Sequence, residues 1–187
     1  DGRGQRYRHW GYSDAPIRRF ATIVAVGRRQ GLHLGVSRTF CFGPPPEQLH
    51  RTHHHAGLLL GTAFYFSQAG WTVDAVFSRV QRIYEKFGAV AEWRCADQGA
   101  LIGYDPCEQQ FAPGNSRTLQ SGQALFWHPS VGPAAVGDSL LIQPEGQTLL
   151  TMSQTWPLLA VSVKGTTIEL PGILSRDGQS EWAIGDG

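Results

Sequence analysis

The apolar residues between positions 73 and 87 recur every three or four positions, and this pattern constrains the fold more than any other feature of the sequence. Large apolar side chains at that spacing line one face of an α-helix. Thr72 is a favourable N-cap for this helix, and Gly88 is a favourable residue to end it. Because a helix buries such a stripe against a second layer, the sequence predicts a layered domain. The stripe consists of Val73, Val76, Phe77, Val80, Ile83, Tyr84 and Phe87.

The segment before this helix has the composition of a β-hairpin followed by another helix. Residues 17–26 and 32–42 are rich in β-branched residues and flank a turn at Gly27–Gly31. Three prolines end the second strand, and a helix is predicted from about residue 46 to residue 69.

The segment after the helix is again β-like, so the sequence predicts an α+β fold with a largely antiparallel sheet. We expect a polar N-terminal segment at 1–16, a domain at 17–170 and a flexible Gly- and Asp-rich tail at 171–187. The further predicted strands are 119–128, 136–143, 149–152 and 158–163.

The composition excludes several classes of protein. Of the 187 residues, 41% are hydrophobic and 17% are charged, which is typical of a chain with a buried core rather than a disordered one. The formal net charge of +1 argues against a nucleic-acid-coating protein, and the apolar stretches are too short to span a membrane. The three cysteines, Cys41, Cys95 and Cys107, form no CxxC pair, so we expect a cytoplasmic location.

Three residues are candidates for acid/base or nucleophilic chemistry. His128 ends an apolar strand and could act as a general base, or it could be a hydrogen-bonded core histidine. Asp97, Asp105 and Asp138 are the nearest acidic candidates, and Asp138 is the one kept as a catalytic candidate beside His128. Cys107 is a candidate nucleophile, but no sequence signature supplies it with a base, which favours a structural thiol.

The run His53-His54-His55 is the other histidine feature. Consecutive residues on a helix point about 100° apart, so these three cannot converge on one metal ion. His50 and His54 are four residues apart and could share a face as two metal ligands. The favoured interpretation is a solvated or half-buried helix face.

Four segments, in the same order, resemble sequence patterns of the creatinase/aminopeptidase P or "pita-bread" family. Residues 31–43 are similar to GY..D.TRTF..G, and 99–108 to GHGIG....E. Residues 119–129 are similar to L.PGMVFTIEP, and 137–151 to EDTVLVTEDG...LT. The segments Arg6–His9 and Gln123–Ser130 most closely resemble a bacterial branch of Xaa-Pro peptidase relatives, in which the second reads QAFAWNPSI.

This resemblance implies a curved, mostly antiparallel sheet with helices on its convex face. Family members carry an additional helical pair before the point where this chain starts, and the chain begins with Asp1 rather than Met. We therefore expect the chain to hold only a C-terminal part of the domain. A homodimer, or association with a missing N-terminal portion, is expected by the same resemblance.

The metal ligands of the family are largely replaced in this chain. The peptidases hold two metal ions with two Asp, one His and two Glu, and those positions fall here on Ala25, Gly35, Ala100, His128 and Gly137. One imidazole cannot hold two hard cations, which need several carboxylate oxygens. We therefore expect no metal and no other cofactor.

The expected function is that of a pseudoenzyme, a fold kept without its peptidase activity, which binds a small molecule, peptide or partner in the inherited cavity. One alternative is a metal-independent hydrolase or lyase that acts on a small amino-acid-like substrate, with His128 as acid/base and Asp138, Cys107 or His33 in support. Another is an active metallopeptidase with relocated ligands. Neither nucleic acid nor membrane is an expected partner. The residues expected to line the cavity are Ala25, His33, Gly35, Ala100, Tyr104, Glu108 and Gly137.

Overall fold

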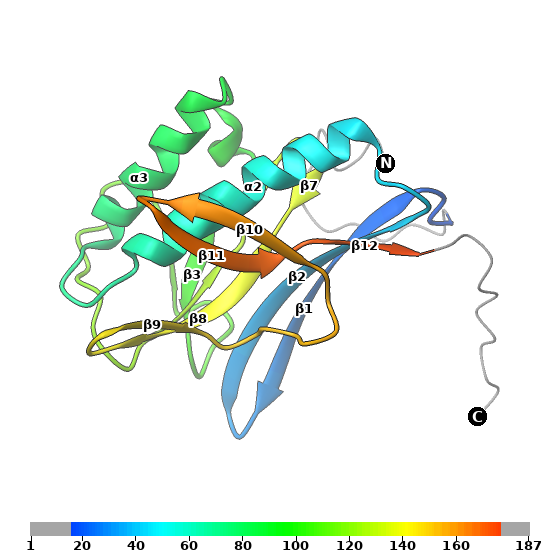
Figure 1. Cartoon of the computed structure of the whole chain (residues 1–187). Helices are drawn as coiled ribbons and strands as arrows, with labels where there is room; N and C mark the ends of the chain where they lie inside the picture. Colours follow the sequence, from blue (N-terminus) through cyan, green and yellow to red (C-terminus); the bar gives the residue numbers. More distant parts are fainter. Residues whose placement is uncertain (1–15, 177–187) are drawn as a thin grey trace.

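A long β-hairpin begins the described part of the chain, residues 16–176 of a computed structural model (Figure 1). Strand β1 (Phe20–Arg29) pairs antiparallel with β2 (Leu32–Phe42). The five-residue turn predicted at Gly27–Gly31 is wrong, because both strands continue to a two-residue turn at Gln30 and Gly31 with φ of 52° and 86°. Positive φ at both central residues matches the right-handed twist of the strands.

The hairpin belongs to a curled, mostly antiparallel sheet of eight strands. Its main path runs β1-β2-β8-β5-β3-β4, with β9 paired to β8 and β12 paired to β2. The predicted strands at 119–128 and 136–143 therefore lie in the same sheet as the hairpin, although β5 is much shorter than expected. The remaining elements of this sheet are β3 (Gly99–Ile102), β4 (Gln109–Gln110), β5 (Ala124–Trp127), β8 (Gly137–Gln143), β9 (Gly146–Leu149) and β12 (Ile173–Arg176).

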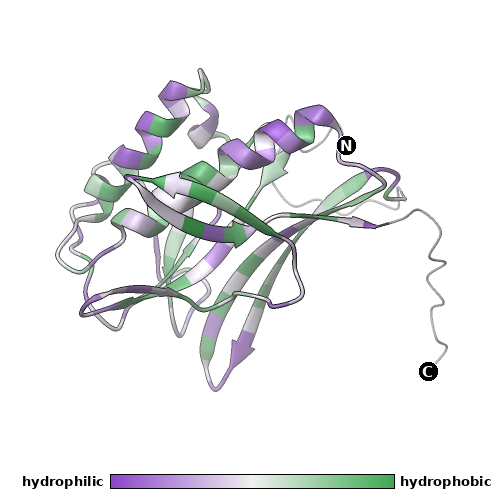
Figure 2. Ribbon diagram, viewed as in Figure 1, coloured by the Kyte–Doolittle hydropathy of each residue, from purple (hydrophilic) through white to green (hydrophobic). Residues whose placement is uncertain are grey.

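Two helices cover the convex face of the sheet, as predicted. Helix α2 spans Glu47–Phe66, and helix α3 spans Val73–Lys86. The Oγ1 atom of Thr72 accepts a hydrogen bond from the backbone N–H of Ala75 at 3.2 Å, which confirms Thr72 as the N-cap of α3. Figure 2 shows apolar residues concentrated where the helices meet the strands. Five residues of the predicted stripe on α3 are buried: Val73, Val76, Phe77, Val80 and Tyr84.

A second hairpin packs on the other side of α2. Strand β10 (Leu158–Val163) pairs antiparallel with β11 (Thr166–Pro171) and crosses α2 in Figure 1. A Cβ atom at Gly57 or Gly61 would lie 2.6 or 2.7 Å from a side chain of β10, so the glycines allow this close approach. Helix α2 is thus enclosed between the sheet and the β10–β11 hairpin.

The chain returns to the main sheet after β11. Strand β12 pairs in parallel with β2, from Ile173 opposite Thr39 to Arg176 opposite Phe42. The flexible tail predicted from residue 171 is therefore wrong for 171–176, which continue the sheet. The rest of that tail, 177–187, and the N-terminal segment at 1–15, including Arg6–His9, lie outside the described residues.

Short elements connect the larger ones. They are the 3-10 helix η1 (Glu92–Arg94) and the small hairpin of β6 (Ser130–Val131) and β7 (Ala134–Ala135). Neither helix in residues 16–176 combines the length and the hydrophobicity that a membrane span requires.

Candidate functional site

Strand β5 directs its side chains alternately to the two faces of the sheet. Trp127 points toward the helices, where its Nε1–H donates a hydrogen bond to Ser67 Oγ at 3.0 Å. Phe126 points to the opposite, concave face, where the family patterns place their metal ligands. The site expected from the sequence is therefore the surroundings of Phe126.

The ring of Phe126 fills this part of the concave face. It is 6% exposed and packs with Val24, Ala100, Ile102 and Ala124, a group that we call the Phe126 cluster. Ala100 stands where the family pattern has a histidine ligand, and it lies directly opposite Phe126 in the pairing of β3 with β5. A position at which the family pattern has a ligand is thus covered by an aromatic ring.

Two glycines at former ligand positions leave the space that this ring occupies. A Cβ atom at Gly35 would lie 2.6 Å from the Phe126 ring, and one at Gly137 would lie 3.0 Å from it. Real Cβ atoms rarely come that close, so Gly35 and Gly137 cannot carry an aspartate or glutamate side chain while Phe126 keeps this position. From the sequence, Phe126 was expected to be an ordinary residue of an apolar strand. The signal was nevertheless present, because the quoted family patterns have threonine or alanine at this position.

Ala25 lies apart from the Phe126 cluster. The two-residue turn places Val26 opposite Gly35 and Ala25 opposite Val36. Because directly paired residues point to the same face, Ala25 faces away from Gly35, while Val24 reaches the Phe126 cluster. The expected placement of Ala25 in the cavity is therefore a misassignment by one residue.

His128 borders the Phe126 cluster at the end of β5. Its ring lies 4.7 Å from the ring of Phe126, centroid to centroid, and its backbone N–H donates to the carbonyl oxygen of Gln98 at 2.8 Å. Burial lowers the pKa of His128 below its ordinary value, and the Asp97 carboxylate opposes that shift. The acidic residue whose charge raises the pKa of His128 is therefore Asp97 and not Asp138.

Asp138 is engaged in an ion pair away from His128. A Cβ at Gly137 would point at His128, so the next residue on β8, Asp138, points to the opposite face. Its Oδ1 accepts hydrogen bonds from Arg38 Nη2 at 2.8 Å and from Thr151 Oγ1 at 2.6 Å. Burial raises the pKa of Asp138, while Thr151 and Arg38 oppose that shift. The partnership of Asp138 with His128 that the sequence suggested does not occur.

Cys107 is exposed in the loop between β3 and β4. Partial burial and the nearby Asp97 carboxylate raise the pKa of its thiol, which keeps it protonated at neutral pH. A nucleophilic cysteine requires the opposite shift. The electrostatics thus favour the interpretation of Cys107 as a thiol without a catalytic role.

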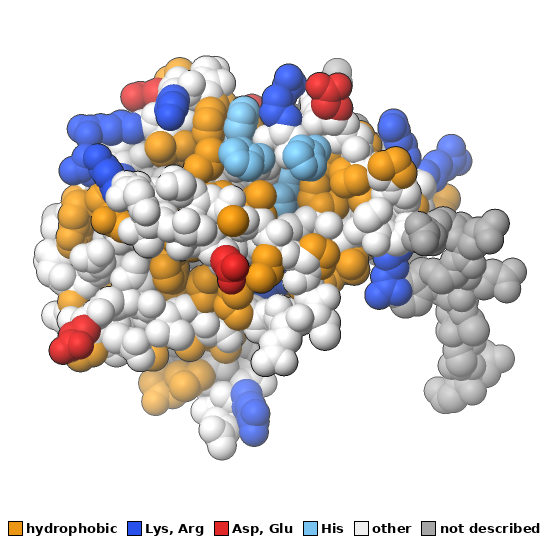
Figure 3. Space-filling view, in the orientation of Figure 1, with side chains coloured by type: hydrophobic (Ala, Val, Ile, Leu, Met, Phe, Trp, Pro, Cys, Tyr) orange, Lys and Arg blue, Asp and Glu red, His pale blue; other side chains and the backbone are white. Residues whose placement is uncertain are grey.

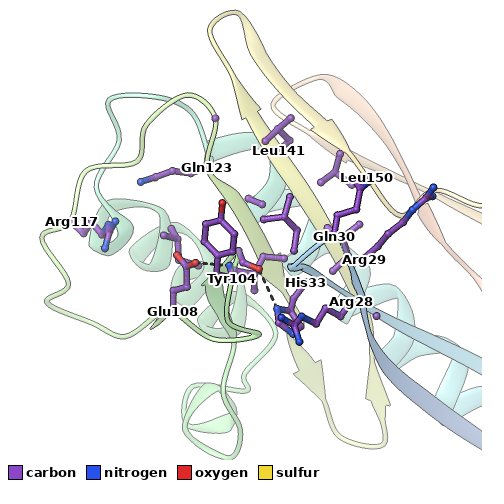
Figure 4. A pocket seen from close by; sticks show the side chains of 18 residues that line it. Arg28, Arg29, Gln30, His33, Tyr104, Glu108, Arg117, Gln123, Leu141 and Leu150 are labelled. Atoms are coloured by element: carbon purple, nitrogen blue, oxygen red, sulfur yellow. Dashed lines mark hydrogen bonds between the residues drawn. The ribbon is translucent and has the colours of Figure 1, made fainter.

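An open groove of about 760 Å³ lies beside the Phe126 cluster, between the tip of the β1–β2 hairpin and the loop that follows β3 (Figure 4). We call it the hairpin groove. It shares Ile102 and Ala124 with the Phe126 cluster. Three residues predicted to line the cavity, His33, Tyr104 and Glu108, line this groove.

Backbone contacts hold these three polar residues in place. His33 Nδ1 lies 3.2 Å from the carbonyl oxygen of Gly103, and the His33 backbone N–H donates to the same oxygen at 2.8 Å. The Glu108 carboxylate accepts a hydrogen bond from the backbone N–H of Tyr104 at 2.9 Å. The tip of β2 is thus joined to the end of β3, and the groove has a defined wall on each side.

The histidine run lies on α2, and no residue of that helix lines the groove. Figure 3 shows histidine side chains on the outer surface of the molecule over this helix. His53 is buried and its Nε2 atom has no hydrogen-bond partner, whereas His50 and His54 are exposed. The ring of His55 stacks on Phe87 at 3.8 Å. Within residues 16–176, no group of three or more His, Cys, Asp or Glu side chains could hold a metal ion, whether at the former ligand positions or on α2.

The structure is similar to solved structures of peptidases. It superimposes on a dipeptidase, PepE, from Mycobacterium ulcerans with a TM-score of 0.74 and 16% identity, which covers 92% of this chain and 45% of that one. A prolidase from Thermococcus sibiricus gives a TM-score of 0.73 and 20% identity, with 80% of this chain and 43% of that one covered. The N-terminal domain of the FACT complex subunit SPT16 from chickpea gives 0.60 and 14%, with 71% and 35% covered.

These similarities confirm the fold predicted from the sequence. The chain has the pita-bread fold of prolidases and Xaa-Pro dipeptidases, and it spans less than half the length of the solved structures that it matches. No protein-family model and no curated protein matches the sequence.

Proposed function

We propose that this chain is a pita-bread protein that has lost the dinuclear metal centre and the peptidase activity, and that it binds a small molecule or peptide in the hairpin groove. The observation that carries the proposal is the position of Phe126. Its ring fills the space into which ligand side chains at Gly35 and Gly137 would project. Loss of the ligands and gain of the ring are therefore parts of one change in packing.

The donor set at the former ligand positions does not fit two metal ions. Ala25, Gly35, Ala100 and Gly137 carry no donor atom in their side chains, and His128 supplies a single imidazole. The hard divalent cations of a hydrolytic site need several oxygen ligands. We derive no metal-assisted step for this chain.

One observation favours the alternative of a metal-independent enzyme. The Asp97 carboxylate acts on both His128 and Cys107, so an acid, a base and a thiol share one region. The protonated thiol and the placement of Asp138 in an ion pair oppose this alternative, and neither His128 nor Cys107 lines the hairpin groove. If the alternative holds, His128→Ala should lower kcat by about 10²–10⁴-fold, the usual range for a general acid/base.

The expected partner and location follow as further parts of the proposal. Ile17 and Ile23, which do not line the hairpin groove, are 52% and 53% exposed, which supports association with a further N-terminal portion or with a second copy. The three cysteines form no disulfide, in agreement with the proposed cytoplasmic location.

Elemental analysis of the purified chain tests the loss of the metal centre. We expect no stoichiometric manganese, cobalt, zinc or iron, and no hydrolysis of Xaa-Pro dipeptides when manganese is added. The prolidase from Thermococcus sibiricus serves as the active control. Two tightly bound ions per chain, or dipeptide hydrolysis that a chelator abolishes, would overturn the proposal and support relocated ligands.

Ligand-observed NMR with a mixture of small acids, amines and dipeptides tests the binding role. Leu34 lies in the groove, so Leu34→Trp should block binding there. Ile23→Trp, a matched change on an exposed strand residue outside the groove, should leave binding unchanged. Binding that survives in the Leu34→Trp variant would show that the groove is not the site.

A further inference from the structure

The floor of the hairpin groove is apolar and partly exposed. Leu32 and Leu34 of β2 are 52% and 36% exposed, and Leu150, after β9, is 39% exposed. Buried residues of the sheet, including Leu101 and Ile102, continue this surface inward. Apolar surface gains about 25 cal/mol for each Å² removed from water, so a ligand with an apolar body is favoured here.

The rim of the groove carries an excess of positive charge. Arg28 and Arg29 line it from the tip of the β1–β2 hairpin, and Arg117 lines it from the loop before β5. Glu108 is the one acidic residue in the lining, and its carboxylate already accepts a hydrogen bond from the backbone of Tyr104. The lining thus contains three arginines and one glutamate, with Arg28 and Arg29 on opposite faces of the hairpin.

These arginines have no acidic partner among the described residues. Arg117 Nη1 donates to the neutral side chain of Gln109 at 2.9 Å, and the ion pair recorded within residues 16–176 joins Arg38 to Asp138 elsewhere. An unpaired guanidinium beside an apolar surface offers its N–H donors to an anionic group, and it does so most strongly where part of the surrounding water is excluded.

We infer that the hairpin groove binds a small amphiphilic carboxylate, such as a medium-chain fatty acid, with its apolar body on the leucine floor and its carboxylate against Arg29, which pairs with Leu32 and so lies on the same face of the hairpin as Leu32 and Leu34. This inference rests on the proposed binding function and adds the class of ligand. A groove of about 760 Å³ falls within the usual range for small-molecule sites. The charge of the rim selects against cationic amphiphiles of the same size, because a cation would be repelled by the arginines.

Titration of the purified chain with octanoate, octylammonium and acetate measures how much the apolar chain and the anionic head each contribute to binding. Octanoate and octylammonium share the apolar chain and differ in charge, whereas acetate has the anionic head alone. We expect octanoate to bind at least about 10-fold more tightly than the other two, and its affinity to fall as salt is raised.

Matched variants locate the site. The variant Arg29→Gln should weaken octanoate binding by about 10-fold, since a charge-assisted hydrogen bond to the carboxylate is lost. Arg82→Gln, on the exposed side of α3, also removes one positive charge, but elsewhere, and should have no effect. Leu34→Asn should weaken octanoate binding while the denaturation midpoint shows that the chain remains folded.

The outcomes distinguish this inference from the proposed function. Equal binding of octanoate and octylammonium, absence of octanoate binding, or octanoate binding that the arginine variant leaves unchanged would each overturn the inference. If amines or dipeptides bind in the groove instead, the inference fails while the proposed function stands. Stoichiometric metal with peptidase activity would overturn the proposed function.

Discussion

The two faces of β5 differ in what they pack against, although their side chains alternate along the same four residues. On the helix side, Trp127 lies in a large core with Phe77 and Phe111, whose rings are 6.4 and 4.6 Å away. On the other side, Phe126 packs in a small cluster of alanine, valine and isoleucine that borders an open groove. The helix side holds the fold together, and the Phe126 side holds the positions at which this chain departs from the family pattern.

This difference shows that the residues that hold the fold and the positions at which the family pattern has metal ligands lie on separate faces of the sheet. Five residues of the stripe on α3 and the helix-side residues of β5 are buried and apolar, as the fold requires. On the concave face, the positions at which the family pattern has metal ligands carry different residues in this chain. Under the proposed function, the fold has outlasted the metal chemistry because site residues add little to the core.

The largest expected effect lies on the helix side. Phe77 is 1% exposed, so Phe77→Ala should lower the free energy of unfolding by about 3–5 kcal/mol, as large-to-small core changes do. Chemical denaturation measures this, with Phe126→Ala as the comparison. The cluster around Phe126 is smaller and opens on the groove, so Phe126→Ala should cost less. An equal or greater cost for Phe126→Ala would remove the distinction between the two faces.

A second expected effect concerns the buried histidine on the helix side. Burial and the neighbouring His50 and His54 lower the pKa of His53 from 6.5 to about 4. The imidazole is neutral in both states above pH 6.5, so its full contribution to stability is present there. As the pH falls from 6.5 to about 4, the unfolded chain binds a proton that the folded chain does not. Stability should therefore drop by about 3 kcal/mol over that interval.

Unfolding measured as a function of pH checks this effect. His53→Leu should remove most of the pH dependence in that interval, whereas His54→Leu, at an exposed neighbouring position, should retain it. If the two variants show the same pH profile as the unchanged chain, protonation of His53 does not control acid stability.

The smallest expected effect tests the mutual fit of Phe126 and Gly35. Gly35→Ala should destabilise the chain by about 1–3 kcal/mol, because the new methyl group meets the Phe126 ring. In a Phe126→Ala background the same change should be nearly neutral, which gives a coupling energy of about 1–3 kcal/mol in a double-mutant cycle. Gly27→Ala is the matched control, since a Cβ there meets no atom within 4 Å. Additive effects of Gly35→Ala and Phe126→Ala would disprove the contact.

The features predicted correctly from the sequence depend on neighbouring residues. The stripe from Val73 to Tyr84, the cap at Thr72 and the hairpin strands follow from local spacing and composition. The order of the four family-like segments then identified the fold, because motifs in register are informative even when each is weak.

The features that were missed depend on which strands pair and in which register. A turn of two residues instead of five moved Ala25 to the opposite face, since a shift of one residue reverses every side chain. The contact of Phe126 with Gly35 joins residues 91 positions apart and is visible only when β2 and β5 are placed together. The pairing of β12 with β2 was missed because the Gly- and Asp-rich composition beyond residue 176 suggested a flexible tail for all of 171–187.

The parallel pairing of β12 with β2 has a consequence for synthesis of the chain on the ribosome. Ser175 Oγ donates to the carbonyl oxygen of Gly43, a contact between residues 132 positions apart. The end of β2 therefore acquires its last neighbour only after more than a hundred further residues have emerged, and until then it presents unpaired backbone groups. Contacts of such long separation slow folding and leave nascent strand edges exposed to other chains, so completion of this sheet is a late event that the hairpin alone cannot achieve.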